Sequence, residues 1–501
     1  MVSELKKHVA LLLIVFLLSR ATFVAYNRPL IKDEALYARM VDEFLEKPRI
    51  IPTYFGQEVA WRPVVPFLLS APFVVASKAI IGLLDVEIDL GLPYRLSSLF
   101  FGACSVVLIY LMFRREFSAD FALCTSLMFM LSFSSLYADT SALVDSVLLF
   151  FVLSSLACYF HGKSDPRFYI LGGILSAFAY WTKTVVAFII PIVAVAYAFE
   201  RKGELRKFEF LISLFFLPLS LFVYDALFEE REAIIGEYLY NIPSKIFGSW
   251  WSTGGIDFEI FKRFVGGLGE FIINSNVLVV SSIIGLCKFW KRRIWLATWM
   301  SLLPLVFFVG VGYFWYPLPL MPAVCAFSSS LIFNRLGGKF DRFSLLIILT
   351  SMAVLMISSL MVLTSGFVDE YAAEREAGLF LAGKEKVLVI GNYVPTVVAY
   401  KMMADGLPKP CIVYIYNSSY REEPYIWKSN IYGFDNKTNY TYNFHVYRAF
   451  WDERNMKIPC GYSEFDWVLT AEKPDWIEVE GYELVNRFGQ NLSVYKKKSA
   501  K

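Results

Sequence analysis

Two adjacent carboxylates, Asp33 and Glu34, follow the first long apolar segment of the chain, which ends near residue 26. Acidic side chains are costly to keep beside hydrocarbon, so acids at such a boundary are candidates for function. Asp33 is a candidate general base, because a carboxylate within reach of a hydroxyl group can accept its proton. The simpler interpretation is that both acids stabilise the start of a helix near Ala35, and the two roles are compatible.

A further acid, Asp145, opens the apolar run 145–161. It could orient an acceptor molecule or a loop, or it could only stabilise the start of a helix, and the two interpretations have similar weight. We therefore take Asp33, Glu34 and Asp145 as candidate catalytic residues. No D-x-D sequence accompanies them, so we expect no metal site and no required cofactor, while a divalent cation stays open.

Four basic side chains near the ends of apolar segments could bind an anion: Arg62, Arg95, Lys183 and Lys245. Any one of them could simply extend from its helix to water. Together they offer the fixed cations and fork-shaped donors that stabilise charge on a phosphate leaving group. Tyr316, beside three prolines, could donate a hydrogen bond to the same phosphate or could be an ordinary interfacial tyrosine.

The composition is that of a polytopic membrane protein. The chain is 57% hydrophobic over 501 residues, which excludes an ordinary soluble protein, and its net charge of +3 gives no indication of a nucleic-acid partner. A spanning helix needs about 20 apolar residues. The sequence predicts 11 such helices, at about 8–26, 93–113, 119–137, 145–161, 168–184, 185–200, 209–227, 268–287, 294–312, 313–333 and 343–364.

The apolar segment 63–83 decides the topology. If this segment does not span, the basic loops after the later segments lie on the side of Lys6 and Lys7, and if it spans, they all lie outside. The positive-inside rule favours the first arrangement. Three prolines and a lysine also interrupt the segment. We therefore predict interfacial helices at about 34–46 and 63–82, with the candidate acids and the C-terminus outside.

The composition becomes more polar from about residue 365. Short runs rich in β-branched and aromatic residues predict buried strands in this part, at 386–391, 411–416, 466–470 and 492–495. We expect two domains, a membrane domain over 1–365 and a small extracytoplasmic α/β domain over 366–501.

Several short motifs in this order resemble those of GT-C fold glycosyltransferases, in particular the aminoarabinose-transferase and protein O-mannosyltransferase group. The resemblance covers roughly residues 8–365. The motifs are Asp33-Glu34-Ala35-x-Tyr37-Ala38, Arg62-Pro63, Tyr94-Arg95-Leu96, Leu143-Val144-Asp145, Trp181-Thr182-Lys183 and the stretch from Tyr316 to Pro322. The family often has Glu-Lys-Pro-Pro where this chain has Trp61-Arg62-Pro63-Val64.

The resemblance implies a GT-C-like membrane enzyme that uses a dolichyl- or undecaprenyl-phosphate sugar as donor. A hexosyl or pentosyl group would pass, with inversion, to a hydroxyl or phosphate of a protein, lipid or glycan acceptor on the extracytoplasmic face. It implies Asp33 as the base, with Arg62, Lys245 and Tyr316 near the donor phosphate. We expect an integral protein of the plasma membrane, in contact with membrane lipids and without a nucleic-acid partner.

Two other classes of protein compete with this hypothesis. A transporter or lipid flippase usually carries ionisable residues near the middle of its spans and has repeated halves, whereas the acids here lie near one face and no repeat is evident. A scaffold without chemistry would leave the acid pair only a structural role. Convergence of Asp33, Asp145, Arg62 and Tyr316 on one external cavity would favour the enzyme.

Overall fold

The structure is a computed structural model of the whole chain. It describes residues 2–25, 30, 32–54, 57–58, 64–84, 90–183, 185–201, 204–227, 258–289, 293–303, 317–335, 350, 354, 357, 367–384, 387–390, 396–397, 400–401, 404, 412–415, 466–470, 481–489 and 492–498. Three candidate phosphate-binding residues, Arg62, Lys245 and Tyr316, lie outside these ranges.

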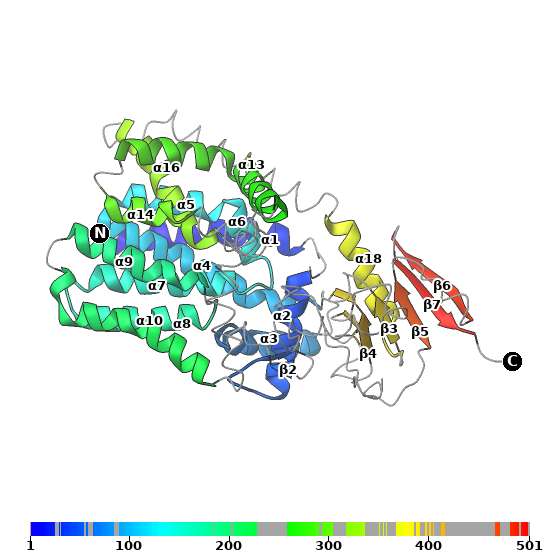
Figure 1. The fold of residues 1–501 in the computed structure, drawn as a ribbon. Coiled ribbons are helices and arrows are strands. Elements are labelled where there is room, and N and C mark those ends of the chain that lie inside the picture. The colour runs from blue at the N-terminus through cyan, green and yellow to red at the C-terminus, as the bar shows by residue number, and fades with distance from the viewer. Residues whose placement is uncertain are drawn as a thin grey trace.

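Most of the described chain is helical, and the helices of the first 335 residues form one bundle (Figure 1). Its elements are α1 (Val2–Ala25), α2 (Lys32–Glu46), α3 (Val65–Leu84), α4 (Leu92–Glu116), α5 (Ala119–Met130), α6 (Phe133–Asp139), α7 (Asp145–His161), α8 (Arg167–Tyr180), η1 (Val185–Phe188), α9 (Ile189–Glu200), η2 (Glu204–Arg206), α10 (Phe208–Leu227), α13 (Phe258–Phe289), α14 (Ile294–Ser301), η5 (Leu318–Leu320) and α16 (Met321–Arg335). A short hairpin of β1 (Thr53–Tyr54) and β2 (Gln57–Glu58) follows α2.

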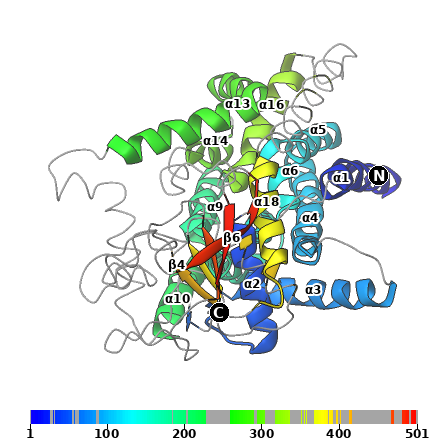
Figure 2. The same cartoon turned by 90° about the vertical axis from the view of Figure 1, so that its right-hand side faces the viewer.

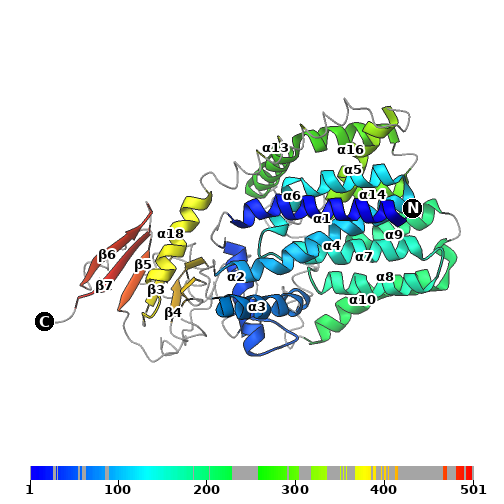
Figure 3. The same ribbon diagram turned by 180° about the vertical axis from the view of Figure 1, so that it is seen from behind.

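Helices α4 and α7 form the centre of the bundle. Helix α4 packs against α1, α3, α5, α6 and α7, and α7 packs in turn against α8 and α9. Figure 3 shows α1, α4, α7 and α8 lying side by side, with α2 across one end of them. Apolar side chains fill the interior, while large apolar side chains of α1, α8 and α10 are exposed on the outside. A bundle that exposes such side chains suits a hydrocarbon solvent.

The described helices differ in their capacity to cross a membrane. Among the described residues, α4 is the one helix that is both long and apolar enough to span by itself. Helices α5 and α6 would suffice only together, and they are bent by 65°. The other apolar helices that the structure describes contain apolar stretches of 10–17 residues, which fall short of the about 20 that a bilayer core requires. The number of 11 spans therefore stays a prediction.

The predicted span at 119–137 is not one straight helix. Helix α5 ends at Met130, and α6 begins at Phe133 after a short break. Ser132 has an extended backbone and its hydroxyl accepts the N–H of Ser135, which starts the new helix. Hydropathy does not reveal such a cap, because serine is common in apolar helices as well. At the ranges predicted for interfacial helices, α2 and α3 form as expected, and α3 continues through Pro72.

The C-terminal part contains helix α18 (Phe367–Phe380) and a five-stranded sheet. The strands are β3 (Val387–Ile390), β4 (Ile412–Ile415), β5 (Trp467–Thr470), β6 (Tyr482–Phe488) and β7 (Leu492–Lys497). Their order is β4-β3-β5-β7-β6, with β3 parallel to β4 and β5, and β7 antiparallel to β5 and β6. Four strands lie at predicted positions, and β6 is additional. Helix α18 packs against β6 and β7.

The C-terminal part packs against the segment that leads into α2. The backbone N–H of Leu30 donates a hydrogen bond to the Tyr400 hydroxyl at 2.8 Å, and both residues are buried. A single hydrophobic cluster joins Leu36 and Val41 of α2 with Ala377 of α18 and with the sheet. Seen from the side of the sheet, α18 and the strands lie over α2 (Figure 2). The helix that carries the acid pair is therefore enclosed between the bundle and the sheet.

A close approach inside the bundle depends on Gly102 of α4. A Cβ atom at this position would lie 2.2 Å from Oδ1 of Asp139, at the end of α6. That carboxylate cannot move aside easily, because Arg20, Ser135 and Ser146 all donate to it. A glycine is therefore required where α4 passes α6.

We expect Gly102→Ala to destabilise the protein by about 1–3 kcal/mol through overpacking. The matched control is Gly269→Ala in α13, where an added Cβ meets nothing within 4 Å. Alanine favours a helix over glycine by up to about 1 kcal/mol, so the control should be neutral or slightly stabilised. Thermal unfolding of the two variants in detergent measures the difference, and equal midpoints would contradict the role of Gly102.

Candidate functional site

The two adjacent acids lie in the first turn of α2 and differ in exposure. Glu34 is fully buried, whereas Asp33 is partly exposed. Carboxylates in the first turn interact favourably with the N-terminal end of a helix, so both positions suit their residue type. The helix therefore directs one acid into the protein and leaves the other at its boundary.

Glu34 forms a buried ion pair with Arg95 of α4. The Nε atom of Arg95 lies 3.1 Å from Oε1 of Glu34, and both side chains are at most 4% exposed. The same Oε1 accepts the backbone N–H of Ala142 at 2.7 Å. Glu34 thus connects α2 to α4 and to the loop 140–144 before α7. Arg95, a predicted phosphate ligand, has its charge matched by a predicted catalytic acid.

Asp145 and Lys183 form a second buried ion pair. Asp145 is the first residue of α7, and Lys183 follows the end of α8. The Nζ atom of Lys183 lies 2.7 Å from Oδ1 of Asp145, with both side chains less than a tenth exposed. The sequence predicted these two residues for different tasks, one as an acid in the reaction and one as a phosphate ligand. The structure brings them together.

A short loop joins the two ion pairs. In the loop 140–144, Ala142 donates to Glu34 and the carbonyl of Leu143 accepts the Ser98 hydroxyl at 2.9 Å. Asp145 follows directly. The start of α3 lies at the same place, because the N–H of Val65 donates to the carbonyl of Trp181 at 3.3 Å. The first residues of α2, α3, α4 and α7 are therefore linked by described contacts.

The segment after Tyr316 also reaches this region. Helix η5 packs against α6 and α7, and the carbonyl of Pro319 in η5 accepts the indole N–H of Trp299 at 3.0 Å. Two described elements of this region, α3 and η5, therefore follow the candidates Arg62 and Tyr316 in the sequence.

A polar cluster at the side of α2 was not predicted from the sequence. The hydroxyl of Tyr94 donates to the Asp42 carboxylate at 2.7 Å, and Lys78 of α3 lies 3.0 Å from the same acid. Asp42 lies eight residues after Glu34, on a similar face of the helix, and this spacing was a usable indication. The cluster attaches α2 to α3 and α4 beside the Glu34–Arg95 pair.

The last turns of α2 carry a further group of charges. Arg39 pairs with Glu43 at 3.0 Å and lies 3.7 Å from Glu46. Desolvation raises the pKa of Glu46 above its usual value, Arg39 opposes this change, and the nearby acids Glu43 and Asp42 add to it. A carboxylate with a raised pKa is protonated more easily, so Glu46 loses its negative charge at a higher pH than an ordinary glutamate does.

Residues 32–222 match the model of the family described as dolichyl-phosphate-mannose-protein mannosyltransferase. This range contains Glu34, Arg95, Asp145 and Lys183, which are all the members of the two ion pairs. A search of curated proteins finds no match.

Two solved structures are similar to this one at low sequence identity. ArnT from Cupriavidus metallidurans bound to undecaprenyl phosphate has a TM-score of 0.55 and 13% identity, with 97% of each chain covered. The oligosaccharyltransferase of Archaeoglobus fulgidus in complex with Zn and sulfate has a TM-score of 0.53 and 13% identity, covering 81% of this chain and 62% of that chain. At such identity these likenesses show the fold.

Replacement of Arg95 by Gln should destabilise the protein strongly, because it leaves the Glu34 carboxylate buried without its cationic partner. Breaking a buried pair on one side costs about 3–5 kcal/mol. The matched control is Lys78→Gln, whose pair with Asp42 is half-exposed and contributes about 0–1 kcal/mol. Unfolding by denaturant in mixed micelles gives both values. The double variant Glu34→Gln/Arg95→Gln should recover part of the loss, and equal effects of the two single variants would contradict the prediction.

The fold and the match to residues 32–222 agree with the resemblance found in the sequence: the chain shares the fold of ArnT, and its residues 32–222 match the family described as dolichyl-phosphate-mannose-protein mannosyltransferase.

Proposed function

We propose that the protein transfers a sugar from a polyprenyl-phosphate donor to an acceptor on the extracytoplasmic face of a membrane. The family match and the GT-C fold support a glycosyltransferase that depends on a polyprenyl phosphate. ArnT was crystallised with undecaprenyl phosphate, which supports a lipid of this class as the carrier. The observation that carries the proposal is the partly exposed Asp33 beside a fully buried and paired Glu34.

Asp33 and Glu34 divide two tasks in this proposal. Glu34 positions α2, because its carboxylate already interacts with Arg95 and with the N–H of Ala142. Asp33 is the base, since it precedes this anchor directly and its side chain reaches the boundary of the protein. A base held by a rigid neighbour keeps its distance to the substrate, which is a large part of catalysis by positioning.

The proposed reaction is a single displacement at the anomeric carbon. Asp33 takes the proton of the acceptor hydroxyl as its oxygen bonds to that carbon. The bond from the carbon to the phosphate oxygen breaks on the opposite face, and its electron pair stays on the leaving polyprenyl phosphate. The configuration at the anomeric carbon is therefore inverted.

The leaving phosphate needs cations that are not already matched by acids. Arg95 and Lys183 are each within about 3 Å of a carboxylate in the buried pairs. We therefore give Arg95 and Lys183 the task of holding Glu34 and Asp145, and assign the donor phosphate to Arg62, Lys245 and Tyr316 on the resemblance to the family. Asp145 would then face the acceptor while Lys183 fixes its position.

The proposed domains, location, sugar and acceptor are based on the sequence predictions. We propose a membrane domain over 1–365 and an extracytoplasmic domain over 366–501, in the plasma membrane. The sugar is a hexose or pentose, and the acceptor is a protein, lipid or glycan. The matched family is described as a protein mannosyltransferase, which supports a protein acceptor.

Asp33→Asn should reduce the release of polyprenyl phosphate at least about 100-fold, the usual contribution of a general base. The measurement is a transfer assay with purified protein and a panel of radiolabelled polyprenyl-phosphate sugars. The matched control is Asp42→Asn, an acid of the same helix that is held by Tyr94 and Lys78 and should keep its turnover. Full turnover by Asp33→Asn would refute the assignment. Specific lipid binding without turnover of any donor would favour a transporter or flippase.

Sugar transfer should persist in the presence of EDTA, because no D-x-D sequence accompanies the candidate acids. The same assay with and without chelator measures this. Loss of transfer that Mg²⁺ or Mn²⁺ restores would show that a metal takes part.

A further inference from the structure

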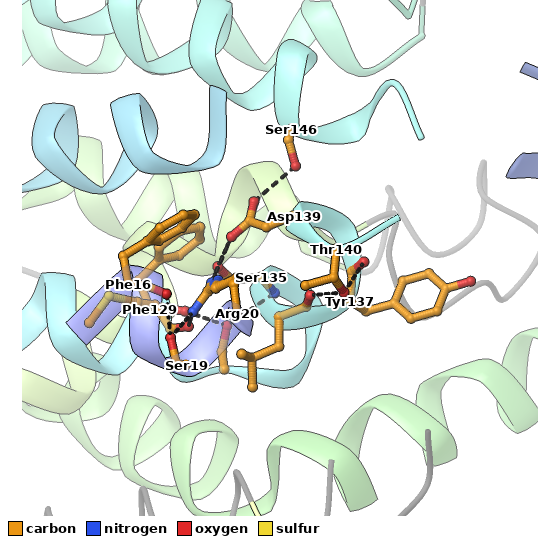
Figure 4. A network of polar contacts seen from close by, with 12 residues as sticks. Phe16, Ser19, Arg20, Phe129, Ser135, Tyr137, Asp139, Thr140 and Ser146 are labelled. Carbon is orange, nitrogen blue, oxygen red and sulfur yellow. Dashed lines mark hydrogen bonds and ion pairs between the residues drawn. The ribbon is translucent and has the colours of Figure 1, made fainter. Parts of the chain in front are cut away.

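A third ion pair lies deep inside the helical bundle, apart from the two pairs of the candidate site. Arg20 of α1 and Asp139 at the end of α6 are joined by a 2.6 Å contact, and both side chains are 1% exposed (Figure 4). Burying charges in such a place costs free energy, so buried charged residues are candidates for a structural or a functional role.

The Asp139 carboxylate joins three helices. Its Oδ2 atom accepts from Nη2 of Arg20 at 2.6 Å and from the Ser135 hydroxyl at 3.0 Å. Its Oδ1 atom accepts from the Ser146 hydroxyl at 2.9 Å. The dashed lines in Figure 4 follow this path from α1 through α6 to the first turn of α7. One side chain thus fixes the start of α7 relative to α1.

The other terminal nitrogen of Arg20 contacts the break between α5 and α6. Its Nη1 atom donates to the carbonyl of Met130, the last residue of α5, at 2.6 Å, and to the Ser19 hydroxyl at 2.9 Å. The flat guanidinium also lies 4.3 Å from the ring centre of Phe16. Arginine suits this place because its rigid fork can satisfy the end of one helix and an acid on the next helix together.

The consequence of this network appears at the candidate site. Asp139 precedes the loop 140–144, and Ser146 follows Asp145 directly. The network therefore holds both ends of the loop that gives Glu34 its N–H donor and carries Asp145 to Lys183. A shift of α7 at Ser146 would change both buried pairs at once.

We propose that Arg20, Asp139 and Ser146 form a positioning network for the reaction, with Ser146 as the contact that sets the place of Asp145. This inference rests on the proposed function. None of the three residues touches a substrate in it. They act by holding the first turn of α7, on which the distance from Asp145 to Lys183 depends.

The test removes only the last contact of the network. Ser146→Ala leaves the Arg20–Asp139 pair intact, so the buried charges stay matched. The matched control is Ser155→Ala, which removes a hydroxyl that is equally buried on the same helix and donates to the carbonyl of Gly172 at 2.7 Å. Both variants lose one buried hydrogen bond, and their thermal midpoints should fall by similar amounts.

We expect Ser146→Ala to lower kcat about 10-fold, since displacement by a fraction of an ångström already affects a reaction that depends on positioning. The KM for the polyprenyl-phosphate donor should change less than about 2-fold, because the network does not contact the donor. Ser155→Ala should keep the kcat of the wild type. Ser146→Thr, which retains the hydroxyl, should restore kcat, whereas Ser146→Val should not.

Hydrogen exchange gives a readout that does not depend on activity. In Ser146→Ala, but not in Ser155→Ala, the amide of Ala142 should exchange faster than in the wild type. Equal kcat, or equal exchange, in the two alanine variants would overturn the positioning role. If the wild type transfers no sugar, the proposed function fails, and the exchange comparison still decides whether Ser146 holds the loop.

Discussion

A charge inside an apolar bundle must have an opposite charge beside it, and the arrangement of the described helices depends on this constraint. Among the described residues, three buried pairs between different elements satisfy it, Glu34–Arg95, Asp145–Lys183 and Arg20–Asp139. Their members are separated by 61, 38 and 119 residues of sequence, so each pair joins helices that the chain alone would not bring together. In hydrocarbon the hydrophobic effect does not drive helices together, and such polar contacts decide which faces meet.

The same constraint explains how two neighbouring acids in one helix turn can have different roles. Glu34 can be fully buried only because Arg95 and the N–H of Ala142 both interact with it. Asp33 precedes it and is partly exposed. In the proposed reaction, the fixed position of Glu34 would hold Asp33 in place through the backbone of α2.

The sequence predicted the elements well and the pairings poorly. Periodicity and apolar length correctly located α2, α3 and four of the five strands, because both are local properties of the chain. Each charge was considered alone, so Arg95 and Lys183 were both expected to bind phosphate, and only the folded structure shows the acids beside them.

The break before α6 depends on the cap at Ser132 and on the contact of Arg20 with the end of α5, neither of which changes the hydropathy. Strand β6 was missed because Leu484 and Val485 are both exposed and its alternation is weak.

The hydrogen bond from Leu30 to Tyr400 has a consequence for how the protein is made. Leu30 leaves the ribosome early, and its acceptor is synthesised 370 residues later. At about 5–20 residues per second this interval is on the order of 20–70 s. The approach to α2 therefore acquires this buried contact only after the helices of the bundle have been made. The segment just before the acid pair is thus fixed late in synthesis, by a part of the chain that lies beyond the bundle.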